Sequence, residues 1–207
     1  MNIVLIGAPL SGKGTQAEQL CNKFNLVHIS TGDLLREIMN QPTPLGKQVK
    51  SYMDKATLVP DDLTIEVIKE ELSKVKNSQG ILFDGFPRTL TQAKKLKEII
   101  DIDLAVYIKA DLQDLLDRIN VRFICSDCKK TNTVYSTVIP KCKFCGGELT
   151  KRKDDTKEIV EYRFDEFKKI TYPIVDYYEK ENKLFTVNGK LSIEEVYKII
   201  EDRLKKI

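Results

Sequence analysis

The stretch Ile3–Thr15, IVLIGAPLSGKGT, joins an apolar run directly to a glycine-rich turn. The run predicts a buried strand. After the turn, Ala17, Leu20, Cys21 and Phe24 recur at offsets of three, four and seven, which predicts a helix with one apolar face. Glycines permit a tight turn whose backbone N–H groups face inward at the positive end of that helix, and the lysine of the turn adds a mobile cation. The stretch therefore predicts a phosphate-binding loop (P-loop).

Four more apolar runs predict buried strands, with helical periodicity between them. They are Leu26–Ile29, Ile81–Phe83, Leu104–Ile108 and Leu184–Val187. Because strands alternate with helices, we expect an α/β fold in which a P-loop opens a doubly wound, five-stranded parallel sheet with helices on both faces.

Two stretches break this alternation. Residues 30–59 have helical periodicity and no strand of their own, and residues 121–155 hold four cysteines without a helical period. In a doubly wound sheet such excursions lie at the carboxyl edge of the strands, where ligands bind. We therefore expect two small insertions over the active site, named the first insertion (30–59) and the second insertion (121–155). The core domain would consist of residues 1–29, 60–120 and 156–207.

Composition excludes several classes of function. The 207 residues are 42% apolar and 31% charged, which fits one globular domain with insertions. Lys and Arg number 34 against 31 Asp and Glu, and a net charge of +3 gives no basic field that would make nucleic acid the partner. The single histidine, His28, excludes any mechanism that needs a histidine pair. Without a signal peptide or an apolar run of membrane length, we expect a soluble cytoplasmic protein with no membrane partner.

The unit Asp84–Arg88, DGFPR, follows the predicted strand Ile81–Phe83. A carboxylate at the carboxyl end of a strand beside the first one suits a hydrated magnesium ion. The Arg88 guanidinium can grip a phosphate at two points. Taken alone, the unit fits a turn with a solvated arginine equally well, but beside a P-loop it favours phosphate binding.

Six arginines fall at helix ends or within the insertions of a lysine-rich chain. They are Arg36, Arg88, Arg118, Arg122, Arg152 and Arg163. For any one of them a surface ion pair is the simpler role. As a set they favour phosphoryl transfer, because that reaction needs charge stabilisation on the phosphoryl oxygens more than it needs a protein nucleophile.

Four of the five cysteines form two close pairs. Cys125-x2-Cys128 is followed, after 13 residues, by Cys142-x2-Cys145. This pattern predicts a four-thiolate zinc site in which two tight knuckles donate N–H groups to the sulfurs, and four protein ligands make the zinc structural. Two disulfides are disfavoured in a reducing compartment, and a redox pair is disfavoured because neither pair opens a helix. Cys21, on the apolar face of the first helix, is expected in the core.

These motifs together resemble the adenylate kinases, in their long-lid, zinc-containing form. The match runs from end to end: Gly7–Gln16, Ser30–Asp33, Leu58–Val59, Asp84–Arg88 with Gln92, Arg152–Asp155 and Val187–Gly189. The resemblance implies that the first insertion binds a nucleoside monophosphate and that the second insertion is a lid. It implies a reversible reaction in which Mg·ATP and AMP give two ADP, with Mg²⁺ and a structural Zn²⁺ as cofactors. Because one chain carries the whole site, we expect a monomer.

The resemblance also implies the role of each site residue. ATP would be held by Leu10, Ser11, Gly12, Lys13, Gly14, Thr15, Arg118, Arg122, Thr131, Asn132 and Leu191. AMP would be held by Thr31, Arg36, Thr57, Leu58, Val59, Gly85, Phe86, Pro87, Arg88, Gln92, Arg152 and Arg163. Lys13, Arg88, Arg122, Arg152 and Arg163 would be catalytic, Asp84 would hold magnesium through water, and Cys125, Cys128, Cys142 and Cys145 would hold zinc. A side-chain amide such as Gln92 can both donate to and accept from an adenine edge, which favours AMP as the acceptor.

Several positions depart from the usual patterns. Gly14 stands where a P-loop usually has a metal-binding hydroxyl, so we expect magnesium to be held largely through water. Leu10 replaces a usual glycine, and we expect its φ to be negative. Val121 replaces a glycine before the lid arginine, and Thr57 stands where a basic residue is common. These departures bear on lid stiffness and affinity and leave the reaction class unchanged.

Acceptor choice and two other function classes complete the set of alternatives. Relatives that act on pyrimidine monophosphates usually carry Asn before Gly-Phe-Pro-Arg and a short lid, so Asp84 and the long second insertion point away from them. A nucleotide-dependent switch would use the same P-loop, but Asn22–Asn25 fails the Asn-Lys-x-Asp guanine motif. A zinc-ribbon nucleic-acid binder would use the lysines near the cysteines and would leave the P-loop without a purpose.

Overall fold

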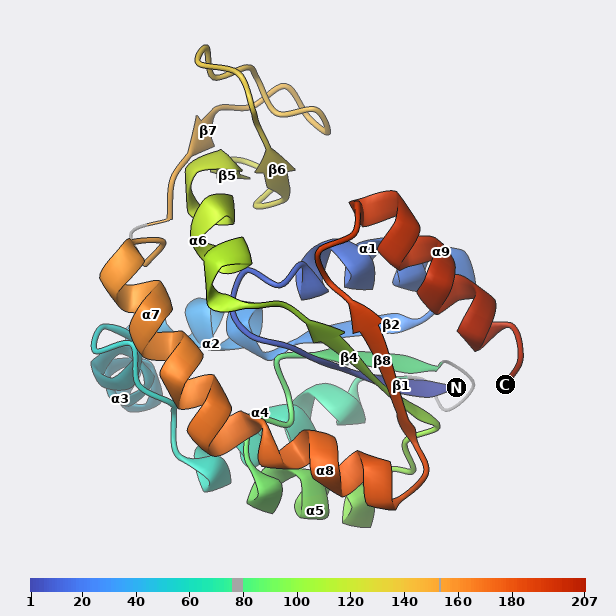
Figure 1. The fold of residues 1–207 in the computed structure, drawn as a ribbon. Coiled ribbons are helices and arrows are strands. Elements are labelled where there is room, and N and C mark those ends of the chain that lie inside the picture. The colour runs from blue at the N-terminus through green and yellow to red at the C-terminus, as the bar shows by residue number, and fades with distance from the viewer. Residues whose placement is uncertain (76–79, 153) are drawn as a thin grey trace.

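The computed structural model describes residues 1–75, 80–152 and 154–207. Its centre is a parallel sheet of five strands in the order β2-β3-β1-β4-β8 (Figure 1). The strands are β1 (Asn2–Ile6), β2 (Val27–Ser30), β3 (Ile81–Asp84), β4 (Leu104–Lys109) and β8 (Leu184–Asn188). Each lies within one residue of its predicted bounds, and neighbouring strands pair in parallel. The predicted fold class is therefore confirmed.

Helices cover both faces of the sheet (Figure 1). One face carries α1 (Lys13–Phe24) and α9 (Ile193–Leu204), and the other carries α4 (Asp61–Ser73), α5 (Leu90–Ile99) and α8 (Pro173–Lys180). Successive side chains of a strand point to opposite faces, so Ile3 and Leu5 pack with α1 and α9, whereas Val4 and Ile6 pack with the other set. Burial on both faces explains why the strands are continuous apolar runs rather than alternating patterns.

The first insertion packs around a small core of its own. It contains α2 (Thr31–Met39) and α3 (Pro44–Met53). Ser30 and Thr43 cap these helices, because each side-chain oxygen accepts a hydrogen bond from the backbone N–H three residues later. Leu35, Val49 and Val59 form the buried cluster between the helices and the chain that returns to α4. This segment therefore stands beside the sheet as a separate apolar unit.

The second insertion follows α6 (Leu112–Val121) and forms a small antiparallel sheet. Its strands are β5 (Arg122–Cys125), β6 (Thr131–Thr133) and β7 (Leu149–Thr150), in the order β6-β5-β7. The sequence did not predict this sheet, because strands of two to four residues are too short to show a period. Lys153, within the Arg152–Asp155 motif, lies outside the described residues.

After the second insertion the chain crosses the molecule as a nearly continuous helix (Figure 1). It consists of α7 (Lys157–Glu166), a π-helical turn η1 (Phe167–Thr171) and α8. Within the described ranges, no helix has the length and apolar character that crossing a membrane requires.

The expected negative φ at Leu10 is wrong: the angle is +65°. For a residue other than glycine the left-handed region costs roughly 1–2 kcal/mol. Two tertiary contacts offset this cost. Arg118 Nη1 donates to the Leu10 carbonyl at 3.0 Å, and the Leu10 side chain packs against the core cluster on the α4–α5 face. Long-range contacts therefore impose on Leu10 a backbone conformation that local preference disfavours.

The side chain of Phe86 lies in the core. The resemblance assigned this residue to nucleotide contact, but its side chain is 0% exposed and its ring lies 6.2 Å from that of Phe83. The neighbouring Gly85 and Pro87 line the cleft described below, whereas Phe86 turns inward between the sheet and its helices. Phe86 therefore anchors the loop from inside the core.

The Phe86→Ala variant should lower the free energy of unfolding by about 3–5 kcal/mol, because it removes a fully buried ring from a packed core. Denaturant unfolding followed by circular dichroism measures this loss. Leu90→Ala, at a partly exposed position nearby, is the control and should change stability much less. Unchanged stability of Phe86→Ala together with lost nucleotide binding would show that the ring belongs to the binding site.

Candidate active site

A single cleft of about 1100 Å³ lies at the carboxyl edge of the sheet and extends between the two insertions. Its lining includes nearly all of the residues predicted to bind nucleotides. These are Leu10, Ser11, Gly12, Lys13, Gly14, Thr15, Thr31, Arg36, Thr57, Leu58, Val59, Asp84, Gly85, Pro87, Arg88, Gln92, Arg118, Arg122, Thr131, Arg152, Arg163 and Leu191. Phe86 and Asn132 are the two predicted residues outside this lining.

The P-loop connects β1 to α1 and wraps around the Lys13 ammonium group. Lys13 Nζ donates to the carbonyls of Gly7 at 2.8 Å and Ala8 at 2.9 Å. Gly12, with φ +99°, turns the chain into the helix, and a Cβ at Gly7 would come within 2.5 Å of Ser11 Oγ. Burial of the ammonium, opposed by Asp84 and reinforced by nearby arginines, lowers the pKa of Lys13 to about 8. Lys13 is therefore a poorly solvated cation that an anion would stabilise.

Asp84 ends β3 beside the P-loop, as predicted. Its Oδ2 lies 3.7 Å from His28 Nε2, and a Cβ at Gly14 would come 3.4 Å from the same oxygen. Burial opposes ionisation, but contact with His28 and the charge of Lys13 lower the pKa of Asp84 below its ordinary value. An ionised carboxylate at this place suits a hydrated cation next to bound phosphates.

Three of the predicted arginines are held by aspartates. Arg36 Nη2 lies 2.5 Å from Asp33 Oδ1, and the Asp33 carboxylate also accepts from Ser30 Oγ at 2.6 Å. Arg163 Nη1 pairs with Asp154 Oδ2 at 2.7 Å. Arg122 Nη1 pairs with Asp155 Oδ1 at 3.3 Å. These carboxylates hold the guanidinium groups in the cleft where phosphate oxygens would be expected to bind.

Arg118 connects the two loops that would surround ATP. Its Nη1 donates to the carbonyl of Leu10, and its Nη2 donates to the carbonyl of Gly189 at 2.5 Å. Gly189 and Leu191 belong to the loop between β8 and α9, on the same side of the cleft. Arg118 therefore fixes the P-loop against the loop that contains Leu191, which the resemblance assigned to ATP binding.

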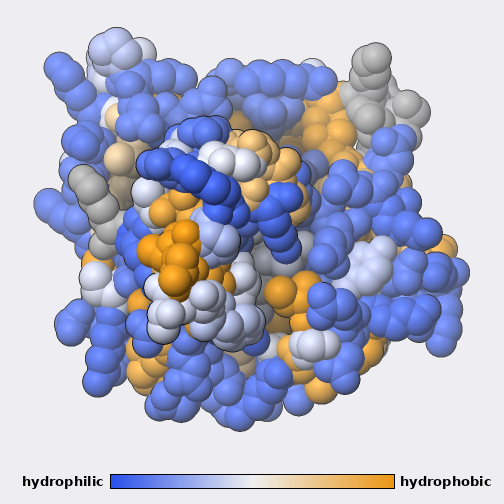
Figure 2. Space-filling view, turned by 90° about the horizontal axis from the view of Figure 1, so that it is seen from above, coloured by the Kyte–Doolittle hydropathy of each residue, from blue (hydrophilic) through white to orange (hydrophobic). Residues whose placement is uncertain are grey.

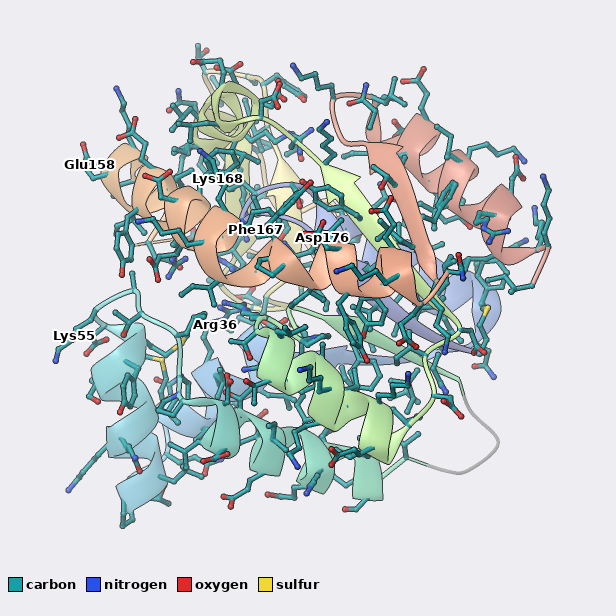
Figure 3. All side chains as sticks on the ribbon, turned by 60° about the horizontal axis from the view of Figure 1, so that its bottom comes forward. Arg36, Lys55, Glu158, Phe167, Lys168 and Asp176 are labelled. Carbon is teal, nitrogen blue, oxygen red and sulfur yellow. The ribbon has the colours of Figure 1, made fainter. Side chains whose placement is uncertain are left out.

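The opposite wall of the cleft comes from the first insertion and from the loop after β3. Arg88 Nε donates to the Gly85 carbonyl at 2.8 Å, which curls its guanidinium over that glycine. Thr31 Oγ1, like Ser11 Oγ in the P-loop, is buried without a hydrogen-bond partner among the residues that the structure describes. Lys55 does not take the place of the basic residue missing at Thr57, because it is exposed and points away from the cleft, unlike Arg36 (Figure 3).

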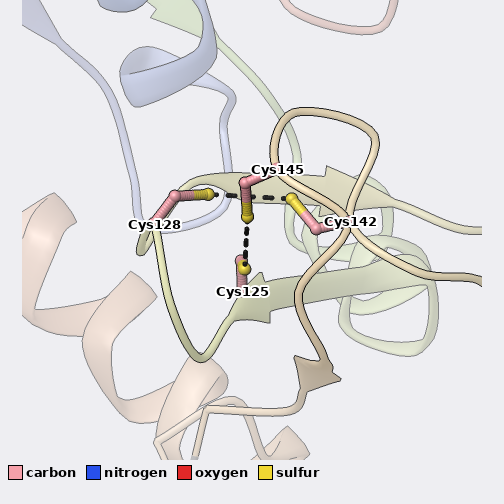
Figure 4. A group of neighbouring side chains, drawn as sticks. All are labelled: Cys125, Cys128, Cys142 and Cys145. Carbon is pink, nitrogen blue, oxygen red and sulfur yellow. Dashed lines mark hydrogen bonds between the residues drawn. The ribbon is translucent and has the colours of Figure 1, made fainter.

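The four paired cysteines meet in space, as their spacing predicted (Figure 4). Their Sγ atoms all lie within 4.8 Å of one another, and the cysteines are free. The two knuckles supply the expected donors: the N–H of Asp127 to Cys125 Sγ at 3.4 Å and that of Phe144 to Cys142 Sγ at 3.5 Å. Four converging sulfurs with N–H donors fit a tetrahedral thiolate site for zinc.

The second insertion has little apolar material inside. Among its described residues the buried apolar side chains are Phe123, Cys125, Val134 and Cys142, and two of these belong to the cysteine cluster. Four of its large apolar side chains are exposed: Tyr135 (86%), Val138 (75%), Ile139 (52%) and Phe144 (45%). Seen from above, a hydrophobic patch stands out on a mostly hydrophilic face (Figure 2). So small a core needs a cross-link, and a metal bound to the cysteines would provide it.

The structure gives Asn132 a different place from the predicted contact with ATP. The residue is 3% exposed, and its Nδ2 donates to Cys142 Sγ at 3.4 Å. Its Oδ1 accepts from the N–H of Lys143 at 3.2 Å, so both ends of the amide are used within the knuckles. Thr131, one residue earlier, points to the other side of β6 and lines the cleft. Asn132 therefore supports the cysteine cluster.

Sequence reasoning missed the acidic partners of the arginines. Asp33 precedes Arg36 by three residues on a helix, a spacing that brings side chains together and that the sequence does contain. Asp154 pairs with Arg163, and Asp155 pairs with Arg122. The fold brings the residues of each pair together, and no local pattern in the sequence indicates the pair of Asp155 and Arg122. His28 also lines the cleft beside Asp84, a position that no pattern in the sequence indicated.

A P-loop at the carboxyl edge of a doubly wound sheet, facing arginines across one cleft, defines a nucleotide-binding protein of the P-loop class. The family profile described as "Adenylate kinase" matches residues 5–183. The chain is 44% identical over 206 residues to an adenylate kinase of Thermosipho africanus, with 96% of each chain covered. It is 43% identical to those of Listeria innocua, covering 97% of each chain, and of Bacillus subtilis, covering 99% of this chain and 98% of the relative. The chain belongs to the adenylate kinase family of enzymes.

A metal held by the four cysteines would stabilise the second insertion, and its removal should destabilise this segment because few apolar contacts hold it. A chelator is expected to lower the melting temperature and to speed protease cleavage within residues 121–155.

The Asn132→Ala variant should bind zinc with an affinity roughly 10–100-fold lower, because it loses the hydrogen bond to Cys142 Sγ. Its KM for ATP should stay unchanged when zinc is saturating. Zinc retention measured with a colorimetric chelator tests this. An unchanged zinc affinity with a raised KM for ATP would return Asn132 to the nucleotide site.

The lowered pKa of Lys13 predicts a pH dependence of ATP binding. Above about pH 8 the lysine of the free enzyme loses its proton, so the affinity for a non-hydrolysable ATP analogue should fall as the pH rises. Lys13→Met should bind the analogue more weakly and without this alkaline decline. Calorimetric titrations from about pH 7 to about pH 9.5 measure both proteins. The same decline in Lys13→Met would show that another group causes it.

Proposed function

We propose that this protein is an adenylate kinase that transfers a phosphoryl group from Mg·ATP to AMP, giving two ADP, in a reversible reaction. The observation that carries the proposal is one cleft with a P-loop on one side and Arg36 and Arg88 on the other. The family membership supports the same activity. One chain supplies the P-loop, Arg36 and Arg88 of this cleft, so we expect the active form to be a monomer.

On the donor side, the P-loop backbone and Ser11 would hold the ATP phosphates, and Lys13 would follow the transferred group. The Lys13 ammonium now bonded to loop carbonyls can exchange them for phosphate oxygens at little cost, because both partners are acceptors. Asp84 would hold, through water, a hydrated magnesium ion that enters with ATP, and this ion would neutralise phosphate charge. The loop around Gly189 and Leu191 would hold the adenine of ATP.

On the acceptor side, Arg36 and Arg88 would fix the AMP phosphate in line with the donor. Thr31 and the chain Thr57–Val59 would enclose the nucleoside, with Gln92 at the base. No general base is required, because the attacking phosphate of AMP is already an anion. Holding two nucleotides in line supplies much of the catalysis by removing the entropy of bringing them together.

Between the two nucleotides, Arg122, Arg152 and Arg163 would stabilise the charge that develops on the transferred group. Arg152 has its Nε buried without a partner among the described residues, and burial together with nearby Arg122 and Arg36 lowers its pKa to about 10. These features suit a guanidinium that gains its hydrogen bonds when phosphate binds. The second insertion would close as a lid and exclude water, which otherwise competes with AMP for the phosphoryl group.

Incubation of the protein with Mg·ATP and AMP should yield ADP in a coupled assay, and Mg·ADP alone should yield ATP and AMP. Lys13→Ala and Arg88→Ala should each lower kcat about 10²- to 10³-fold, because each removes a charge from the transition state. Both variants should retain a folded circular dichroism spectrum. Lys94→Ala, an exposed lysine on α5 outside the cleft, is the matched control. Full turnover in either active-site variant would contradict the assigned roles.

A further inference from the structure

The buried Gln92 amide is held at one end by a group that can only donate a hydrogen bond and at the other end by a group that can only accept one. Gln92 lies in the first turn of α5, lines the cleft and is 2% exposed. Its Oε1 accepts from the backbone N–H of Arg88 at 2.7 Å, and its Nε2 donates to Asp61 Oδ1 at 2.8 Å. A backbone N–H can only donate and an ionised carboxylate can only accept. The two neighbours therefore select one orientation of the amide.

Asp61 is itself fixed in this position. It occupies the first turn of α4, and its second oxygen, Oδ2, accepts from Thr89 Oγ1 at 2.8 Å. Thr89 in turn accepts from the backbone N–H of Gln92 at 3.1 Å, which caps α5. The carboxylate therefore bridges the starts of two helices and reaches Gln92 from one direction.

If the Gln92 amide turned over, two contacts would become repulsive at once. Its oxygen would face the Asp61 carboxylate, and its NH₂ group would face the N–H of Arg88. A mismatched buried contact with a charged group costs more than one between neutral groups. Asp61 therefore contributes more to the orientation than Arg88 does.

Among the described residues, each polar atom of the Gln92 amide has one hydrogen-bonding position still unused: a second lone pair on Oε1 and a second hydrogen on Nε2. An adenine edge offers a donor, its 6-amino group, next to an acceptor, N1. A 6-oxopurine offers the inverse, an acceptor at O6 next to a donor at N1. When the phosphate of a nucleotide is anchored at Arg36 and Arg88, its base can approach the Gln92 amide in only one orientation. An amide with a fixed orientation therefore matches only one of these two edges.

We propose that Asp61 is a specificity-determining positioning residue, which fixes the Gln92 amide in the orientation that accepts a 6-aminopurine monophosphate and rejects a 6-oxopurine monophosphate. The inference rests on the proposed function, because it concerns the base of the acceptor nucleotide. It assigns base selection to a residue outside the lining of the cleft. The Gln92 amide contacts the base, and the Asp61 carboxylate on the neighbouring helix α4 determines which end of that amide is the donor.

The test compares AMP with IMP, whose base differs at the 6-position and N1, as acceptors for Mg·ATP. Asp61→Asn keeps the volume, and its amide can accept from or donate to Gln92, so turning Gln92 over would then break only the Arg88 contact. The ratio of kcat/KM for AMP to that for IMP should fall roughly 10- to 100-fold. Asp62→Asn, an exposed neighbour in the same helical turn, removes the same charge and should leave the ratio unchanged.

A purely structural role for Asp61 would lower both kcat/KM values by the same factor, and an unchanged ratio would overturn the proposal. Asp61→Ala provides a second variant, with the same direction expected. Calorimetric titration of AMP and of IMP into each protein measures the preference without the reaction, and thermal melting checks folding. Wild-type protein that makes no ADP from Mg·ATP and AMP would refute the proposed function. Wild-type activity with an unchanged ratio in Asp61→Asn would refute only the role of Asp61.

Discussion

Positive charge gathered in one cleft is the constraint on which the rest of the structure depends. Its lining includes Lys13 and six arginines: Arg36, Arg88, Arg118, Arg122, Arg152 and Arg163. Burial and like-charge neighbours lower the pKa of Lys13 to about 8 and that of Arg152 to about 10, so holding these charges together costs folding free energy. Loop carbonyls and three aspartates offset part of that cost. Phosphate groups would offset more of it, which links nucleotide binding to the stability of the closed site.

The fold supplies these charges from separate parts of the chain. The carboxyl ends of β1 and β3 bring Lys13 and Asp84 together, and α6 and α7 carry the arginines that flank the second insertion. The second insertion contributes Thr131 and Arg152 from a segment whose own core is too small to be stable without a cross-link. Zinc bound to the four cysteines would therefore act on the chemistry indirectly, by keeping the segment that carries Arg122 and Arg152 folded.

The sequence predicted what depends on local pattern. All five strands of the parallel sheet lie within one residue of the apolar runs, and the P-loop and cysteine spacing placed their side chains correctly. What it missed depends on contacts between distant residues. Leu10 takes a positive φ because Arg118 and the core hold it, and Phe86 turns inward because its ring fills space beside Phe83. Asn132 and Asp61 have polar partners that become neighbours only in the folded chain, so residue type alone could not assign their roles.

The proposed function requires one chain to hold a nucleoside triphosphate and a nucleoside monophosphate at the same time, with their phosphates between the P-loop and the arginines. Calorimetric titration of AMP into protein saturated with Mg²⁺ and a non-hydrolysable ATP analogue tests it most directly. One AMP should bind per chain while the analogue stays bound. Displacement of the analogue by AMP, or no binding of AMP to the saturated protein, would contradict it.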